Sequence, residues 1–180
     1  MASLGERMIG AMKADVATFE EIEHDPNALG QAVTVIVIAG VAALIGNIFR
    51  AGISAGVFAL IISLIAYAVW AVLVTIIGTK LMPEPTTKAD FAETFRTIGF
   101  AASPGVFNVL AIIPFLGPLI SLVISIWSLI IMVIAVRTAL DYTSTGRAIV
   151  VVLIGWVVYL IVSGILGLMF FGASMVAGHM

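Results

Sequence analysis

The stretch NVLAIIPFLGPLISLV, Asn108–Val123, lies inside a longer run, 97–136, that holds no Asp, Glu, Lys or Arg. As one α-helix this longer run would extend for about 60 Å, whereas the hydrocarbon core of a bilayer is only about 30 Å thick. Pro114 and Pro118 each lack a backbone N–H, and together with Gly117 they favour a tight turn between two helices. The run is therefore predicted to cross a membrane twice, with a structural turn at these three residues.

The composition indicates the class of protein. Hydrophobic residues make up 62% of the chain, charged residues make up 10%, and the mean hydropathy is +1.25. Soluble domains are about 45–50% apolar and about 25% charged, so only lipid can cover such an excess. The sequence predicts an all-α integral membrane protein. The absence of cysteine excludes disulfides, thiolate metal sites and thiol nucleophiles.

Five membrane-spanning helices are expected, because an apolar run of about 17–25 residues can cross once and helices satisfy their own backbone in lipid. Their approximate ranges are 31–49, 57–78, 98–113, 118–137 and 147–171. The third range is short and contains Pro104, so this helix is expected to begin at the interface. The spans form one domain over 31–172, preceded by a cytoplasmic amphipathic segment (1–30) and followed by a short outer tail (173–180). The polar segment 1–30 is not expected to be a cleaved signal peptide.

The distribution of charge predicts the orientation. With five spans, Arg50 is the only one of the eight lysines and arginines on one side, and all ten acidic residues lie with the others. Basic residues in short loops favour the cytoplasmic side. The N-terminus is therefore predicted to be cytoplasmic and the C-terminus to lie outside, in a multi-pass protein of the cell inner (plasma) membrane.

The N-terminal segment is predicted to form one amphipathic helix, over about residues 4–22. Ser3 and Glu6 match a capping box. Apolar residues fall on one side of a helical wheel: Leu4, Met8, Met12, Val16, Phe19 and Ile22. This face could lie on the inner leaflet or dock on the protein's own loops, and the acidic character of the segment argues against strong attraction to anionic lipid. Asp25 followed by Pro26 predicts the start of the first span.

Apart from Arg137 and Arg147, which stand at the ends of their ranges, no Asp, Glu, Lys, Arg or His lies inside the predicted spans. Proton-coupled transporters usually carry such residues, and a serine nucleophile needs a neighbouring base, so neither a proton-coupled transporter nor an enzyme is expected. A channel lined by backbone carbonyls stays open as an alternative. The two histidines, His24 and His179, lie outside the spans and are read as solvated residues. We expect no cofactor, no metal ion and no nucleic-acid partner.

Two groups of span residues are candidates for a functional role. Ser121, Ser125 and Ser128 share one face of the fourth span and could line a cavity together with Asn108. Close helix packing is the favoured alternative, because small and hydroxylated residues let helices approach. The second group is the tryptophans, which lie within spans instead of in the usual interfacial belts. For Trp70, Trp127 and Trp156, core packing is the default interpretation, and contact with lipid, a hydrophobic ligand or another protein is the alternative.

The sequence FAETFRTIGFAASPGVFNVLAIIPFLGPLISLVISIWSLIIMVIAVRTAL, residues 91–140, carries a recognisable set of motifs. They are Gly99-Phe100 before Pro104, the Ile-Pro-Phe-Leu-Gly turn, Ile126-Trp127-Ser128-Leu129 and Ala135-Val136-Arg137. Two more motifs lie outside this range: Gly146-Arg147-Ala148 and the leader TFEEIEHDPNALGQAV before the first span. With these motifs the chain resembles the Yip1 domain family in its short prokaryotic form. The resemblance implies a five-helix membrane domain with a cytoplasmic N-terminus. Eukaryotic members are associated with vesicle traffic and Rab GTPases, but their Asp-Leu-Tyr-Gly-Pro motif is missing here, so a Rab-type partner is not expected.

The function expected from the sequence is that of a non-enzymatic multi-pass protein which binds or organises other membrane proteins. An accessory subunit of a larger membrane complex is one version of this hypothesis. The expected partners are membrane lipids and other integral membrane proteins or a second copy of the chain, and the candidate contacts are Trp70, Trp127, Trp156, Phe19 and Ile22. The alternative is a transporter or channel for a hydrophobic or uncharged solute, lined by Asn108, Ser121, Ser125 and Ser128.

Overall fold

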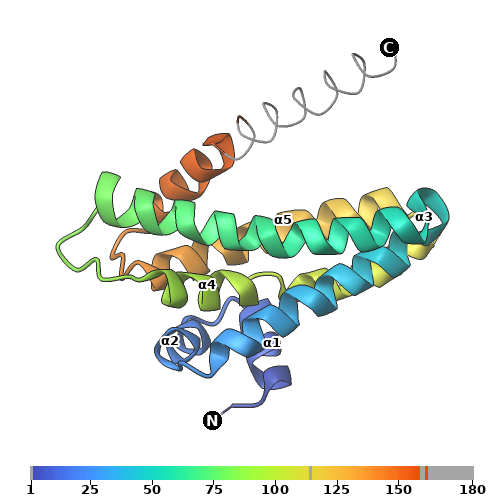
Figure 1. The fold of residues 1–180 in the computed structure, drawn as a ribbon. Helices are drawn as coiled ribbons and strands as arrows, with labels where there is room; N and C mark the ends of the chain where they lie inside the picture. The colour runs from blue at the N-terminus through green and yellow to red at the C-terminus, as the bar shows by residue number, and fades with distance from the viewer. Residues whose placement is uncertain (1, 114, 159–160, 162–180) are drawn as a thin grey trace.

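The computed structural model describes residues 2–113, 115–158 and 161, and within these ranges every regular element is a helix (Figure 1). The elements in chain order are α1 (Leu4–Met12), α2 (Val16–His24), α3 (Ala28–Ile76), the π-helix η1 (Ile77–Leu81), α4 (Phe91–Phe100), the 3₁₀-helix η2 (Ser103–Ile112), α5 (Gly117–Ala139) and a last helix, Thr145–Val158. The predicted all-α class is therefore confirmed for the described residues. Part of the fifth predicted span, 147–171, and the predicted outer tail with His179 lie outside them.

Within the described residues, three helical segments are long and apolar enough to cross a membrane. They are Ala28–Leu81, Phe91–Ile112 and Gly117–Ala139, and Thr145–Val158 is a shorter apolar helix. Many of their outward side chains are large and apolar, and Ile61, Leu122 and Ile126 are each more than half exposed. An apolar surface of this extent needs lipid or another protein to cover it.

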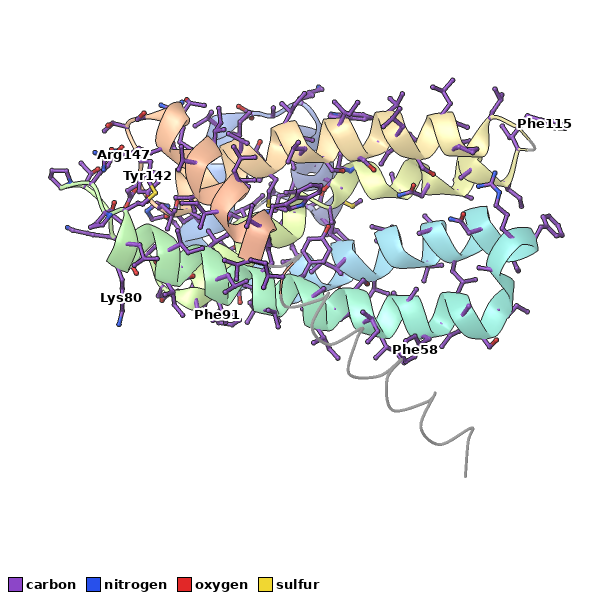
Figure 2. All side chains as sticks on the ribbon, turned by 90° about the horizontal axis from the view of Figure 1, so that it is seen from above. Phe58, Lys80, Phe91, Phe115, Tyr142 and Arg147 are labelled. Atoms are coloured by element: carbon purple, nitrogen blue, oxygen red, sulfur yellow. The ribbon has the colours of Figure 1, made fainter. Side chains whose placement is uncertain are left out.

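The helix α3 is bent back on itself at Gly52, so it forms two antiparallel limbs, 28–51 and 53–76, that lie side by side (Figures 1 and 2). The backbone of Gly52 has φ 80°, a conformation that glycine adopts without the steric cost of a side chain. The limbs approach closely, since a Cβ at Gly40 would clash with Leu60 on the other limb. The first two predicted spans, 31–49 and 57–78, are thus joined by one sharp bend in place of a loop.

A second hairpin is formed by η2 and α5, and its turn lies between Ile112 and Gly117. Phe115 in this turn has φ 64° and is 98% exposed, while Pro118 lies in the first turn of α5. Pro114 lies outside the described residues. The tips of the two hairpins meet at one end of the bundle, where the Arg50 Nη2 donates a hydrogen bond to the Ala111 carbonyl at 3.5 Å.

The opposite end of the bundle carries Lys80, Tyr142 and Arg147 (Figure 2), and we call it the charged end. At the charged end, α4 packs against α3, and its residues 94–100 are buried. The approach depends on small residues, because a Cβ at Gly99 would lie 2.8 Å from the Ala32 Cβ. The third predicted span, 98–113, is in the structure a short α-helix followed by a 3₁₀-helix that begins next to Pro104.

The N-terminal segment forms two helices, and the expectation of one helix over residues 4–22 is wrong. The predicted capping box of Ser3 and Glu6 is present in α1. The chain then breaks at Ala14, which has φ 58°, and Asp15 caps α2 by accepting from the Ala17 N–H at 3.3 Å. This local hydrogen bond and that of Thr18 to the same carboxylate (2.7 Å) favour a new helix start over continuation.

The apolar faces of α1 and α2 dock on the protein itself, which is one of the two alternatives that the sequence left open. Ala11, Phe19 and Ile22 are fully buried in the core that α2 shares with α4 and α5. Helix α3 begins at Ala28, two residues after Pro26, which the sequence predicted as its first residue. Asp25 instead accepts a hydrogen bond from the Asn27 N–H.

Arg7 connects the N-terminal helices to the start of α3. Its side chain is 1% exposed, and its guanidinium forms ion pairs with Asp25 (2.6 Å) and Glu21 (3.0 Å) and donates to the Gln31 side chain (2.8 Å). Hydrogen bonds from Arg7 are the largest cause that lowers the pKa of both carboxyls. One buried cation therefore joins α1, α2 and the start of α3.

Candidate functional site

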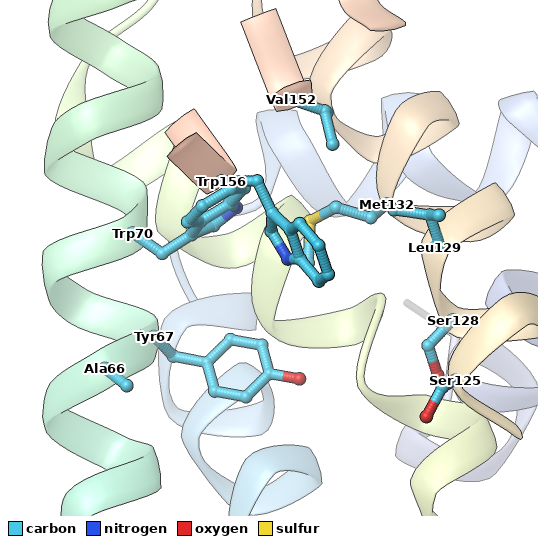
Figure 3. A pocket seen from close by; sticks show the side chains of 9 residues that line it. All are labelled: Ala66, Tyr67, Trp70, Ser125, Ser128, Leu129, Met132, Val152 and Trp156. Atoms are coloured by element: carbon cyan, nitrogen blue, oxygen red, sulfur yellow. The ribbon is translucent and has the colours of Figure 1, made fainter. Parts of the chain in front are cut away.

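A pocket of about 370 Å³ lies between the second limb of α3, α5 and helix 145–158 (Figure 3). We call it the aromatic pocket. It is lined by Ala66, Tyr67, Trp70, Ser125, Ser128, Leu129, Met132, Val152 and Trp156.

Helical spacing explains why these residues meet. Tyr67 and Trp70 are three residues apart on α3, and Val152 and Trp156 are four apart on the last helix, so each pair occupies one helix face. The α5 lining residues follow the same spacing: Ser125, Ser128, Leu129 and Met132. Close approach of the last helix to α3 depends on Gly155, where a Cβ would lie 3.0 Å from the Trp70 ring.

Three hydroxyl groups give the aromatic pocket its polar character. The Tyr67 hydroxyl points toward the side of the pocket formed by Ser125 and Ser128 (Figure 3). Ser125 donates to the Ser121 carbonyl at 2.8 Å. The hydroxyls of Tyr67 and Ser128 have no hydrogen-bond partner among the described residues. In an apolar environment an unpaired hydroxyl is costly, so these two groups could hydrogen-bond to an occupant of the pocket.

The aromatic pocket opens at the outer surface of the bundle. Trp70 forms its inner wall and is only 9% exposed, whereas Trp156 is 55% exposed and Leu129 is 46% exposed. The opening is thus bordered by apolar side chains of helices that are themselves mostly apolar. An occupant would enter sideways, from the direction of the surrounding lipid or of a neighbouring protein.

The structure brings some of the sequence-predicted site residues together and separates others. Trp70, Trp156, Ser125 and Ser128 line the aromatic pocket. The other two polar candidates are not part of its lining, and the Asn108 side chain donates to the Gly105 carbonyl at 3.1 Å. Only two of the four polar candidates, Ser125 and Ser128, therefore line the aromatic pocket. The remaining partner candidates, Phe19 and Ile22, are buried in the protein core and are not presented to lipid.

Trp127 has a structural contact of its own. Its indole N–H donates to the Met12 carbonyl at 2.9 Å, and its ring stacks on Phe107 with a centroid distance of 5.8 Å and an interplanar angle of 15°. This side chain fixes the end of α1 against α5.

Replacing Trp127 with phenylalanine should loosen α1 at a cost of about 1 kcal/mol, because the hydrogen bond to Met12 is lost while an aromatic ring remains to stack. Hydrogen–deuterium exchange of residues 4–12 in lipid nanodiscs measures the effect, expected as a several-fold faster exchange. Trp156→Phe makes the same chemical change at an exposed tryptophan and should leave α1 unaffected. Equal exchange in Trp127→Phe and wild type would show that this hydrogen bond does not hold the helix.

The comparison with protein families agrees with this architecture. The family model of the Yip1 domain matches residues 9–173. The chain belongs to the Yip1 domain family. The resemblance noted in the sequence is thereby confirmed, and with it the membrane-protein class. No curated protein and no solved structure gives a significant match to the chain.

The matched Yip1 domain contains every described residue of the aromatic pocket. Tyr67 was missed in the sequence, although its position three residues before Trp70 was a usable signal for a shared helix face. Met132 was missed as well, and an apolar residue in an apolar helix gives no such signal. The buried Arg7 of this Yip1 domain protein was also missed, because an arginine in an amphipathic pattern normally belongs to the solvated face.

Proposed function

We propose that this Yip1 domain protein is a non-enzymatic multi-pass membrane protein that binds membrane-spanning helices of other proteins at the aromatic pocket. In this proposal the chain crosses the inner membrane five times: with the two limbs of α3, with α4 and η2, with α5, and with the helix that begins at Thr145. The charged end faces the cytoplasm, as the positive-inside rule requires. If the chain always binds the same membrane proteins in a fixed ratio, it acts as an accessory subunit of a larger membrane complex.

The observation that carries this proposal is the sideways opening, in an apolar surface, of a pocket where the hydroxyls of Tyr67 and Ser128 have no partner among the described residues. Transmembrane helices associate through packing and through side-chain hydrogen bonds, each of which contributes about 0.6–2 kcal/mol. The volume of about 370 Å³ is at the lower end of ligand pockets, which span about 300–1,000 Å³. It suits one or two bulky side chains from a neighbouring helix better than a whole lipid molecule.

The chemistry of the lining supports binding over catalysis. The aromatic pocket offers hydroxyls, indoles and a thioether, and its lining residues include no carboxylate, amine or imidazole. General acid–base catalysis near neutral pH relies on those groups. We therefore propose a binding role for the site.

Photo-crosslinking tests the proposal in the native membrane. A benzophenone amino acid in place of Trp156 should crosslink to a defined set of membrane proteins. After mild detergent extraction, intact-complex mass spectrometry should find the same proteins in a fixed ratio with the chain. The matched control is the same probe at Val123, which is 54% exposed on α5 and is not among the pocket residues. The double variant Tyr67→Phe, Ser128→Ala should weaken recovery of the set at least threefold. A chain that extracts alone or only with copies of itself would overturn the proposal.

Passage of a small uncharged solute is the second candidate, because Ser125 and Ser128 do lie in a pocket, as a solute pathway lined by these serines would require. Purified protein in liposomes should then accelerate glycerol flux, and Ser128→Leu should abolish the acceleration. Flux equal to that of protein-free liposomes would remove this candidate.

A further inference from the structure

A second cavity, of about 430 Å³, lies at the charged end between α2 and the end of α5. Its lining differs from that of the aromatic pocket, since most of its residues carry charged or polar side chains. They are Val16, Glu20, Glu23, His24, Arg137, Thr138, Asp141 and Tyr142. We call it the Glu23 cavity.

The Glu23 side chain is the unusual member of this lining. It is only 4% exposed, and its carboxylate has no hydrogen bond and no ion pair with any described residue. The nearby Arg96 does not neutralise it directly, because the guanidinium donates through Nε (3.1 Å) and Nη2 to the Glu23 backbone carbonyl. A buried carboxylate without a partner is costly, so it calls for a cationic partner or for protonation.

Three other polar side chains of the Glu23 cavity already have hydrogen-bond partners. Arg137 donates through Nε to the Tyr142 carbonyl at 3.2 Å, and the Tyr142 hydroxyl lies 2.8 Å from the Met82 carbonyl. The His24 Nδ1 lies 2.8 Å from the Glu20 carbonyl. Of the three carboxylates in the lining, Glu20 and Asp141 are exposed to solvent and only Glu23 is buried, so Glu23 gains most from an ionic contact.

The electrostatics of the Glu23 cavity favour a positive occupant. Glu23 and His24 are the last residues of α2, and Arg137 and Thr138 belong to the last turn of α5. Two helix C-termini, each equivalent to about half a negative charge, thus border the same space. The lining also contains three carboxylates against the one permanent cation Arg137.

We propose that the Glu23 cavity binds a primary ammonium or guanidinium group, with the Glu23 carboxylate as its counter-ion. The group could belong to a small amine or to a basic side chain of a protein segment, and both sources share the same chemistry. This site is separate from the aromatic pocket, so the two proposals fail or succeed independently.

The pH dependence of binding follows from the surroundings of Glu23. Burial is the main cause that raises the pKa of the Glu23 carboxyl to about 7, Asp141 and Glu93 raise it further, and His24 and Arg96 oppose the shift. The titratable groups facing it are those of α2, α4, the end of α5 and the following loop: Glu20, His24, Glu93, Arg96, Arg137, Asp141 and Tyr142. An alkylammonium keeps its charge over this range, so its affinity should rise between pH 6 and pH 8 as Glu23 loses its proton.

Calorimetric titration of the full chain in lipid nanodiscs with n-butylammonium tests the site. We expect binding at pH 8 that weakens at least tenfold in Glu23→Gln and less than twofold in Glu6→Gln, which changes an exposed carboxylate of α1 outside this cavity and keeps the capping box, since glutamine also serves there. Glu23→Gln should fold at least as well as wild type, because the amide needs no counter-ion. Equal affinity in wild type and Glu23→Gln, or no binding of n-butylammonium to wild type, would overturn the proposal.

Two further arms refine the result. A capped Ala-Lys-Ala peptide that binds tighter than n-butylammonium points to a protein segment as the natural source, and equal affinity points to a free amine. The variant His24→Gln removes the other group that titrates in this range, since the pKa of His24 is raised by its hydrogen bond to the Glu20 carbonyl and by Glu23. The rise in affinity from pH 6 to pH 8 should persist in that variant, and its loss would count against Glu23 as the counter-ion.

Discussion

Replacing Arg7 with alanine is expected to lower the free energy of unfolding by about 3 kcal/mol, the low end of the range for breaking a buried ion pair. The guanidinium is 1% exposed and serves Asp25, Glu21 and Gln31 at once. Its removal leaves the Asp25 carboxylate, which is 13% exposed, without its cation. The expected loss is at the low end of the range for buried ion pairs because Glu21 is 42% exposed and water can solvate its carboxylate.

Unfolding in mixed detergent micelles, followed by tryptophan fluorescence, measures the loss. Lys13→Ala is the matched control, since it removes a positive charge from an exposed position next to the same helix and should change stability by less than about 0.5 kcal/mol. Limited proteolysis should also cut the Arg7→Ala variant before residue 28, where α1 and α2 have lost their anchor. Equal stability of the two variants would show that the ion pairs contribute nothing to docking.

The second large effect is expected at Gly46, in the first limb of α3. A Cβ at this position would clash with the Asn108 backbone carbonyl of η2. A backbone atom cannot rotate away as a side chain can, so Gly46→Val must force the limb and η2 apart. Overpacking of a well-packed core costs about 1–3 kcal/mol, and we expect a loss at the upper end of that range.

Gly30→Val is the matched control for Gly46→Val, because Gly30 lies on the same helix and has no neighbouring atom within 4 Å of the point where a Cβ would lie. The same unfolding assay should show a loss of about 1 kcal/mol or less for the control, as for most surface substitutions. A Gly46→Val protein as stable as Gly30→Val would mean that α3 and η2 can separate without penalty.

The features predicted well from sequence depend on local signals. The run 97–136 was too long for one crossing and contained Pro114 and Pro118 close together, and the structure places a chain reversal between Ile112 and Gly117. The Ser3–Glu6 capping box was equally readable, because the whole motif lies within a short contiguous stretch of sequence. The break at Ala14 was harder, since neither glycine nor proline marks it and the signal was only the capping residue Asp15.

The features missed in sequence depend on how helices are placed against one another. In α3 and α5 almost every position is apolar, so the pattern does not show which face meets a neighbour. The joining of Tyr67, Ser128 and Trp156 in one pocket follows from helix rotation and from the close approach at Gly155. Burial of Arg7 and Glu23 was likewise unreadable, because charged side chains of an amphipathic segment are normally solvated.

The two adjacent α5 residues Trp127 and Ser128 serve different neighbours. The first is held by the Met12 carbonyl and the second lines the aromatic pocket, about 100° apart around one stiff helix. A rotation of α5 about its axis that widened the pocket would also displace the Trp127 indole from the Met12 carbonyl and so weaken the hydrogen bond that holds α1. A ligand in the aromatic pocket and the contact that holds α1 would therefore influence each other through the orientation of α5.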